Sequence, residues 1–248
     1  MSTLLLRLAG PLQSWGSASR FTRRGTENAP TKSGVLGLLA AAQGRPRTAD
    51  LSDLAALRFG VRIDQPGTRL RDFQTAHHAD SGKAMPLSER FYLADAVFLA
   101  GVEGETAFLQ RLYEALLAPV FLPYLGRRSC PPSRPITMGP PEDVPLEDAL
   151  RTTPWQVSKY YARRPGGAAA TPELDVLIDS RSGERPDITI RDAPLSFDPR
   201  HRQYGLRGVR TGDVATPPRA ESAPTPKVPA HDPTAGLPLA GHEPPRTS

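Results

Sequence analysis

The sequence holds a single cysteine, Cys130, among its 248 residues. One thiol excludes an intrachain disulfide and a zinc site built from several cysteines, and it is typical of a reducing compartment. Long apolar runs are also missing, because Arg7 interrupts the N-terminal one and no later run reaches the roughly 20 residues of a membrane span. We therefore expect a cytoplasmic protein without a signal sequence and without contact with a membrane.

Neither sign of charge is in large excess, since 31 Lys and Arg against 26 Asp and Glu give a net charge of +5. A net positive charge favours polyanionic partners. Because the excess is small, the positions of the charges are more informative than their sum. Residues 141–149 are acidic, whereas residues 8–44 contain only one acidic residue, Glu27. The basic residues of this first segment are Arg20, Arg23, Arg24 and Lys32. Basic character is therefore local.

Apolar periodicity predicts an α+β fold. The expected strands are residues 2–8, 58–64, 90–102 and 120–125, and the expected helices are residues 50–57 and 105–117 together with one that starts at Thr31 or Ser33 and ends at Gly44. Leaving the short helix 50–57 aside, the order β-α-β-β-α-β is the ferredoxin-like arrangement, which we assign to a domain of residues 1–130. Many RNA-binding modules share it, although a fold alone does not define a function.

The second and third strands are joined by an unusually long connection, residues 65–89. Hairpin loops usually have about two to five residues, and a much longer one is usually functional or disordered. This connection carries five basic or histidine side chains: Arg69, Arg71, His77, His78 and Lys83. Its strand-like segment TRLRDFQTA favours an ordered arm that projects from the sheet.

The pattern weakens after residue 130. A short helix at 146–151 and strands at 174–179, 187–191 and 203–210 predict a small β-rich appendage over residues 131–210. From about residue 211 the chain is crowded with proline, alanine, threonine and charge and has little to bury. We expect residues 211–248 to form a disordered tail.

The loop QSWGSASRFTRR and the helix start that follows it have the composition of a nucleic-acid site. Trp15 and Phe21 offer faces for unstacked bases, while arginine forks and N–H groups at a helix start bind phosphates. The alternatives are that both aromatics belong to the core and that Lys32 is a solvated residue near a plain helix cap. The segment PTKSGVLG lacks the Gly-Lys-Ser/Thr order of a phosphate loop, so we reject an NTPase.

Three other features have less specific interpretations. Adjacent strand residues point to opposite faces, so His77 and His78 do not suit joint binding of a metal ion. Cys130 has no histidine that can be placed beside it, and we expect a small buried side chain rather than a nucleophile. The basic segment PRHRQYGLRGVR is either a second electrostatic patch or an edge strand protected by charge.

The combined motifs resemble the Cas5 family of type I-E CRISPR systems. They are LRLAGPLQSWGSASRFTRR with PTKSGVLGLLAAA, then FGVRIDQPGTRLRDFQTAHH, PLSERFYLADAVFLAGVEG and PVFLPYLGRRSCPP, which span about the first 135 residues, with a weaker likeness in RQYGLRGVR. The resemblance implies a non-catalytic RAMP protein with no metal or cofactor. It implies a subunit of Cascade that caps the 5′ handle of the CRISPR RNA, touches Cas7 and Cas8, and reaches target DNA near the first guide positions.

The resemblance also implies roles for particular residues. The RNA contacts would be Gln13, Trp15, Ser19, Arg20, Arg23, Arg24, Lys32, Ser33, Arg127 and Arg128. The arm would be the thumb of the family, with Arg71, Phe73 and His77 as its functional residues. Phosphate contacts would supply affinity, and stacking and base-edge contacts would supply specificity.

An endoribonuclease is the alternative, because Cas5 of type I-C systems cuts precursor RNA without a metal. There the ribose 2′-OH attacks the adjacent phosphate with help from a Tyr, Lys and His set. The candidates in this chain are Tyr92, Lys32, Lys83, His77 and His78, but the sequence does not place three of them together. A generic single-strand binder outside any complex is a third possibility.

Overall fold

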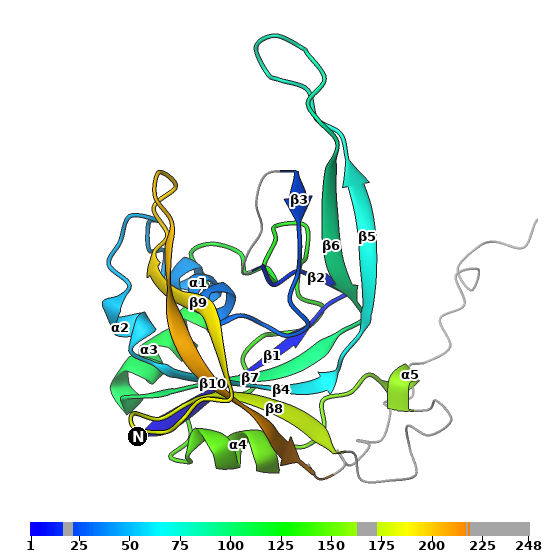
Figure 1. Cartoon of the computed structure of the whole chain (residues 1–248). Coiled ribbons are helices and arrows are strands. Elements are labelled where there is room, and N and C mark those ends of the chain that lie inside the picture. Colours follow the sequence, from blue (N-terminus) through cyan, green and yellow to red (C-terminus); the bar gives the residue numbers. More distant parts are fainter. Residues whose placement is uncertain (17–21, 163–172, 217, 219–248) are drawn as a thin grey trace, which may run out of the picture.

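The computed structural model describes residues 1–16, 22–162, 173–216 and 218 (Figure 1). Its main sheet is antiparallel and has the strand order β1-β7-β4-β8-β10-β9. In that order the strands are Ser2–Ala9, Val97–Gly104, Arg58–Gln65, Leu174–Asp179, Gln203–Ala215 and Ile188–Ser196. A smaller sheet joins β2 (Leu12–Gln13), β3 (Arg23–Arg24), β5 (Thr68–Gln74) and β6 (Ser88–Ala94). The predicted mixed α+β class is thus confirmed.

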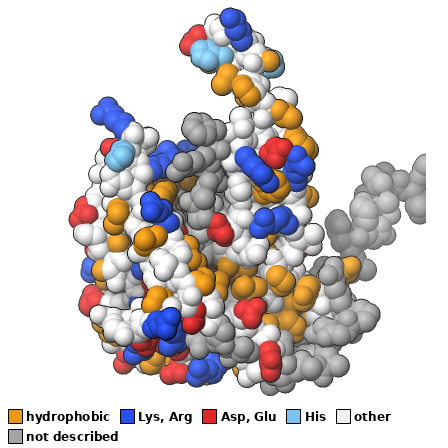
Figure 2. Space-filling model, in the orientation of Figure 1, with side chains coloured by type: hydrophobic (Ala, Val, Ile, Leu, Met, Phe, Trp, Pro, Cys, Tyr) orange, Lys and Arg blue, Asp and Glu red, His pale blue; other side chains and the backbone are white. Residues whose placement is uncertain are grey.

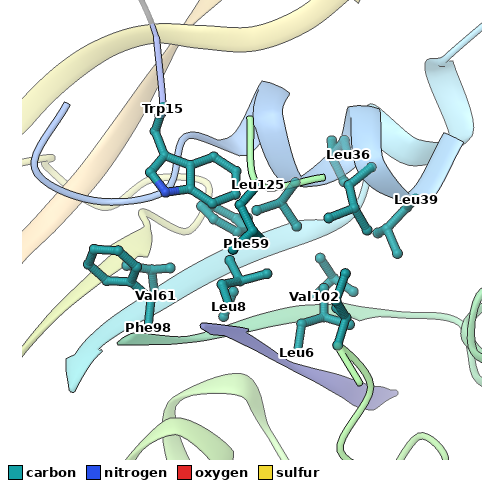
Figure 3. Close-up of a cluster of buried hydrophobic side chains, with 14 of the residues drawn as sticks. Leu6, Leu8, Trp15, Leu36, Leu39, Phe59, Val61, Phe98, Val102 and Leu125 are labelled. Atoms are coloured by element: carbon teal, nitrogen blue, oxygen red, sulfur yellow. The ribbon is translucent and has the colours of Figure 1, made fainter. Parts of the chain in front are cut away.

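Both faces of the main sheet are covered by helices. On one face, α1 (Lys32–Ala42) packs over alternating apolar side chains of β1, β4 and β7 (Figure 3), and α3 (Thr106–Leu117) covers the same face. On the other, α4 (Leu146–Thr152) covers Leu99, Val176 and Ile178. Each fully buried Leu, Val or Phe side chain stabilises the fold by about 1.5–3 kcal/mol. Two short helices, α2 (Ser52–Ala55) and α5 (Lys159–Ala162), complete the set, and no described helix is long and apolar enough to cross a membrane.

The helix predicted between Thr31 and Gly44 is found with the expected ends. The Thr31 hydroxyl accepts a hydrogen bond from the N–H of Gly34 (3.3 Å), as an N-cap should. At the other end Gly44 has a φ of +74°, the left-handed conformation that glycine adopts without strain. These two signals fix the helix that underlies the site described below.

The strand predicted at residues 120–125 is wrong. The N–H groups of Val120 and Phe121 bond instead to the carbonyls of Ala42 and Ala41 in the last turn of α1, where carbonyls lack partners further along the helix. The free edge of β1 is taken by residues 133–142, which run irregularly along it with antiparallel bridges from Thr3 to Glu142 and from Leu6 to Thr137. The first five elements of the expected β-α-β-β-α-β order are therefore found, but residues 133–142 take the place of the sixth, a strand.

The long connection is an ordered β-hairpin. β5 and β6 pair antiparallel from Thr68↔Ala94 to Gln74↔Ser88, and Figure 1 shows this hairpin projecting far from the main sheet. The single strand expected at residues 90–102 is in fact two, β6 and β7, which are separated by Asp95 at a φ of 55°. That turn passes the chain from the arm back into the main sheet.

The predicted separation of a small C-terminal appendage is wrong. Its expected helix and strands are present as α4, β8, β9 and β10, but β8 pairs directly with β4 and continues the main sheet. The expected tail also begins too early, because β10 extends to Ala215. Residues 217 and 219–248 of that tail lie outside the described residues.

Candidate nucleic-acid interface

A groove of about 1680 Å³ lies over α1, between the loop after α3 and the β9–β10 hairpin. Figure 1 shows two hairpins, β5–β6 and β9–β10, rising on either side of α1 and β3. Every charged residue in the described lining of the groove is an arginine. These are Arg24, Arg45, Arg47, Arg127, Arg128, Arg191 and Arg202. A concave surface with charges of one sign attracts a polyanion strongly.

Two of these arginines are already engaged. The Arg45 guanidinium bonds to both carboxylate oxygens of Asp53 (2.7 and 2.5 Å), and this bond raises the pKa of Arg45. Arg127 donates to the carbonyls of Phe91 (3.2 Å) and Arg24 (2.8 Å) and lies 4.8 Å from the Tyr92 ring centroid. The other five have no carboxylate partner in the part of the chain that the structure describes, so they are available to phosphates.

The floor of the groove is the side of α1 that carries small residues, including Ser33, Gly34, Gly37, Ala40 and Ala41. A Cβ at Gly34 would lie 2.8 Å from the Trp15 ring, so only glycine lets the helix approach that ring. Small side chains leave the helix surface low and smooth. A chain lying on this floor can approach the helix backbone closely.

The prediction that Gln13 and Trp15 contact RNA is wrong. The Gln13 amide is fully buried, donating to the carbonyls of Leu8 (3.0 Å) and Ala96 (2.8 Å) and accepting from the Trp15 indole N–H (3.0 Å). Trp15 is 1% exposed and packs in the core (Figure 3), so it has no face for a base. Buried polar groups must be satisfied internally, and these two residues support the loop.

The prediction that Lys32 binds phosphate is also wrong. Its ammonium group forms an ion pair with Asp179 (2.8 Å) and its side chain is 8% exposed. Its backbone N–H, at the start of α1, donates to the carboxylate of Asp192 (2.8 Å). The start of the helix does bind an anion, but this anion is the carboxylate of Asp192. Ser33 lines the groove with its side chain mostly buried.

Arg207 completes this buried cluster of charges. It bonds to Asp179 (2.6 Å) and to both carboxylate oxygens of Asp192 (2.5 and 2.9 Å). Burial alone would lower the pKa of Arg207, but the two carboxylates outweigh it and the pKa is raised. Two cations and two anions balance, and they join the start of α1 to β8, β9 and β10.

The remaining predicted loop residues have mixed outcomes. Ser19 and Arg20 lie outside the described residues. Arg23 and Arg24 form β3 and are exposed; Arg24 lines the groove, while the Arg23 guanidinium lies 5.4 Å from the Phe91 ring centroid. The structure thus brings Arg24 together with Arg127 and Arg128, which were predicted from a distant part of the sequence.

Gly126 allows the turn with Arg127 and Arg128 to pack close to the first loop. It has a φ of +82°, and a Cβ there would lie 1.8 Å from the carbonyl oxygen of Ser14. The turn that carries Arg127 and Arg128 therefore packs directly against the first loop. A side chain at this position would push the two segments apart.

The predicted thumb residues share the projecting hairpin but do not line the groove. Arg71 pairs with Glu89 (2.5 Å) and lies 4.6 Å from the ring centroid of Phe73, which is half exposed. His77 bridges to Ala84 near the tip. Figure 2 shows Lys and Arg side chains on both projecting hairpins.

The residues proposed for RNA cleavage are not assembled into a site. Lys32 is held by Asp179, and Tyr92 is buried under Arg127. His77, His78 and Lys83 lie in the tip of the hairpin, where the N–H of His78 bonds to the carbonyl of Lys83 (2.9 Å). Cys130 is buried, and burial raises the pKa of its thiol. Within the described ranges no cluster of His, Cys, Asp and Glu suits a metal ion.

Sequence reasoning missed the far wall of the groove. Arg45 and Arg47 follow α1, and Arg191 and Arg202 belong to the β9–β10 hairpin. The basic segment at residues 199–210 was a signal for part of this wall, but its interpretation as an edge strand is wrong, because β10 lies between β8 and β9. Arg202 extends the positive patch, while Arg207 is a buried structural charge. Three aromatics of the groove, Tyr124, Phe197 and Tyr204, had no signal of their own.

Comparisons with known proteins show what the chain is similar to. The family described as CRISPR-associated protein (Cas_Cas5) matches residues 3–210. The CRISPR system Cascade subunit CasD of Escherichia coli (strain K12) is 39% identical over 227 residues, which cover 83% of this chain and 93% of that protein.

Two solved structures are similar over most of their length. A crystal structure of a Cas protein has a TM-score of 0.68 at 39% identity and covers 88% of this chain and 98% of its own. A chain of a CRISPR RNA-guided surveillance complex has a TM-score of 0.71 at 34% identity, with 87% and 91% covered. The motifs read from the sequence, the fold and these relatives lead to one conclusion: the chain belongs to the Cas5 family of CRISPR-associated proteins.

Proposed function

We propose that this chain is a non-catalytic, RNA-binding subunit of a type I-E Cascade complex and that its groove holds the 5′ handle of the CRISPR RNA. One observation carries the proposal: the described lining of the groove has seven arginines and no carboxylate. Single-stranded RNA offers closely spaced phosphates for guanidinium groups and unstacked bases for aromatic rings. The relative named as a Cascade subunit supports the same role.

The β5–β6 hairpin is proposed as the thumb, at the edge of the guide and of the target DNA. Its exposed side chains include the apolar Leu70, Phe73 and Met85, and the Arg71 guanidinium lies over the Phe73 ring. A free hairpin of this length has little to bury on its own account. We propose that its apolar side chains are covered in the assembled complex.

The surfaces for Cas7 and Cas8 are proposed to include the loop after α3. Leu117, Val120, Phe121 and Leu122 are consecutive or nearly so and all exposed, Leu122 by 84%. A contiguous apolar patch of this kind marks an interaction site in a soluble protein. We also propose that β1, α1, β4, β7 and α3 are five elements of a ferredoxin-like unit whose sixth position residues 133–142 occupy, and that the complex is cytoplasmic.

The proposal is tested by asking which RNA copurifies with the chain when it is coexpressed with Cas7, Cas8 and a CRISPR array. The expected RNA is the mature CRISPR RNA, and Arg127→Ala with Arg128→Ala should reduce its recovery. Arg151→Ala is the matched control, since it removes an exposed charge from α4 on the opposite face of the sheet. Unchanged recovery with the double variant at physiological salt would contradict the proposed handle site.

Cleavage is tested separately, by incubating the purified chain with repeat RNA in EDTA. The binding role predicts full-length RNA, because the Tyr, Lys and His candidates are not assembled. A shortened product that disappears with His77→Ala would instead support the nuclease alternative.

A further inference from the structure

The β9–β10 hairpin carries an aromatic pair on the groove. Phe197 follows β9 and Tyr204 lies in β10, with ring centroids 6.5 Å apart and planes inclined by 56°. Both rings line the groove and are half-buried. A Cβ at Gly37 of α1 would lie 3.5 Å from two ring carbons of Phe197, so this ring rests on the smooth floor. Tyr204 stands next to it on the wall.

The backbone around Tyr204 is irregular in a way that turns side chains. The pairing of β10 with β9 changes register between Gln203 and Tyr204 and again between Gly205 and Leu206. Bulges re-aim side chains and are frequent next to functional sites. Here two irregularities flank Tyr204 and Gly205, and the rest of the pairing between β9 and β10 is regular. The wall is therefore shaped around the position of Tyr204.

The wall is also held firmly. Asp192 of β9 and Arg207 of β10 are locked together, and Asp192 accepts the N–H of Lys32 at the start of α1. The aromatic pair therefore keeps its place relative to the helix floor before any ligand arrives. Binding to a ring that is already fixed costs less conformational entropy than binding to a mobile ring.

Polar groups around the pair suit a nucleotide. Arg191 and Arg202 are exposed on the same wall and have no carboxylate partner among the described residues, and the exposed amide of Gln203 adjoins Tyr204. Asp192, the acidic residue beside Arg191, is buried and engaged by Arg207. An aromatic face with guanidinium groups and an amide nearby is how proteins receive an unstacked base and its phosphates.

We propose that Phe197 and Tyr204 form a subsite for one unstacked base of the bound RNA, with Tyr204 as the stacking ring and Arg191 and Arg202 on the flanking phosphates. The inference rests on the proposed function, that the groove binds RNA, and adds a specific nucleotide position on the far wall. It assigns the β9–β10 hairpin as a second RNA-contacting hairpin opposite the arm.

The test uses the full chain and a fluorescein-labelled single-stranded RNA with the 5′ sequence of the organism's own CRISPR RNA. Tyr204→Ala should weaken binding by about tenfold, as loss of one base–aromatic stack does. Tyr204→Phe, which keeps the ring, should bind within about twofold of the unchanged protein. Thermal melting of both variants checks that the fold is intact.

A scan of abasic nucleotides then locates the base. With the unchanged protein, one abasic position should weaken binding by about tenfold, and with Tyr204→Ala the same position should have no further effect. This scan needs no variant to show a sensitive position. If no abasic position weakens binding, or if Tyr204→Ala leaves the sensitive position unchanged, the subsite is refuted. If Arg128→Ala with Arg191→Ala also binds RNA normally, the proposed function fails as well.

Discussion

Removing charge from the two walls of the groove at once should change how RNA binding responds to salt. Arg128 and Arg191 come from opposite walls, and neither has a carboxylate partner among the described residues. If each of the five available arginines neutralises one phosphate, the slope of log K against log salt should be about −3.5, because one single-strand contact contributes about −0.7. The double variant Arg128→Ala/Arg191→Ala keeps three contacts, so its slope should be about −2.1.

These slopes correspond to measurable affinities. Between about 50 and about 200 mM salt, the unchanged protein should lose about 100-fold in affinity and the double variant only about 20-fold. Fluorescence anisotropy with the labelled CRISPR RNA fragment, repeated at four or more salt concentrations, gives both slopes. Arg151→Ala, on the far face of the sheet, should keep the original slope.

The reasoning would be refuted by parallel salt dependences. If the double variant bound more weakly but with an unchanged slope, the two arginines would act through the fold rather than through phosphates. If Arg151→Ala lowered the slope as much as the double variant, binding would depend on net charge and not on the groove.

Three further predictions concern the framework of the site. Gly126→Ala should lower both the melting temperature and the RNA affinity, because the new Cβ would overlap the first loop. Gly82 has a similar positive φ (+64°) with open space around it, so the control Gly82→Ala should lower the stability by only about 1–2 kcal/mol and leave RNA binding unchanged. Glu147 has a pKa lowered from 4.5 to about 2, mainly by its hydrogen bond from Arg58, so its stabilisation is fully present above about pH 4.5 and is lost as the pH falls toward 2. Glu147→Gln should remove about 3 kcal/mol at neutral pH and flatten the acid limb of the stability curve, as measured by urea unfolding across pH; an unchanged acid limb would contradict this assignment. Asp64→Asn leaves the fully buried Arg62 without its counter-charge and should cost about 3–5 kcal/mol in the same assay, and a cost below 1 kcal/mol would contradict it.

The sequence signals that succeeded were local ones. The hydroxyl of Thr31 and the glycine at position 44 marked both ends of α1 because capping depends on neighbouring residues. Residues 120–125 failed because their apolar pattern is that of a strand, while the pattern does not say which surface the side chains meet. The N–H groups of Val120 and Phe121 bond to the end of α1, and the side chains of Val120, Phe121 and Leu122 remain exposed.

The site shows the same division between local and distant information. Arg24 was predicted from the composition of the first loop, Arg127 and Arg128 from the resemblance to the Cas5 family, and all three line the groove. The ion pair and hydrogen bond of Lys32 could not be predicted from neighbouring residues, because the partners, Asp179 and Asp192, come 147 and 160 residues later in the chain. A lysine at a helix start has the same local signature whether it meets a phosphate or a buried carboxylate.

The pairing of β8 with β4 also affects the order in which the chain can fold on the ribosome. Gly60, Val61 and Arg62 find their partners only when residues 176–178 have been synthesised, so β4 emerges with an open edge that can pair with other chains. Lys32 must stay hydrated until Asp179 appears, which delays closure of the helix start over the sheet. The groove is thus completed only near the end of synthesis, so a chain interrupted before β8 would have only β1, β7 and β4 of the main sheet and would lack the wall that the β9–β10 hairpin forms.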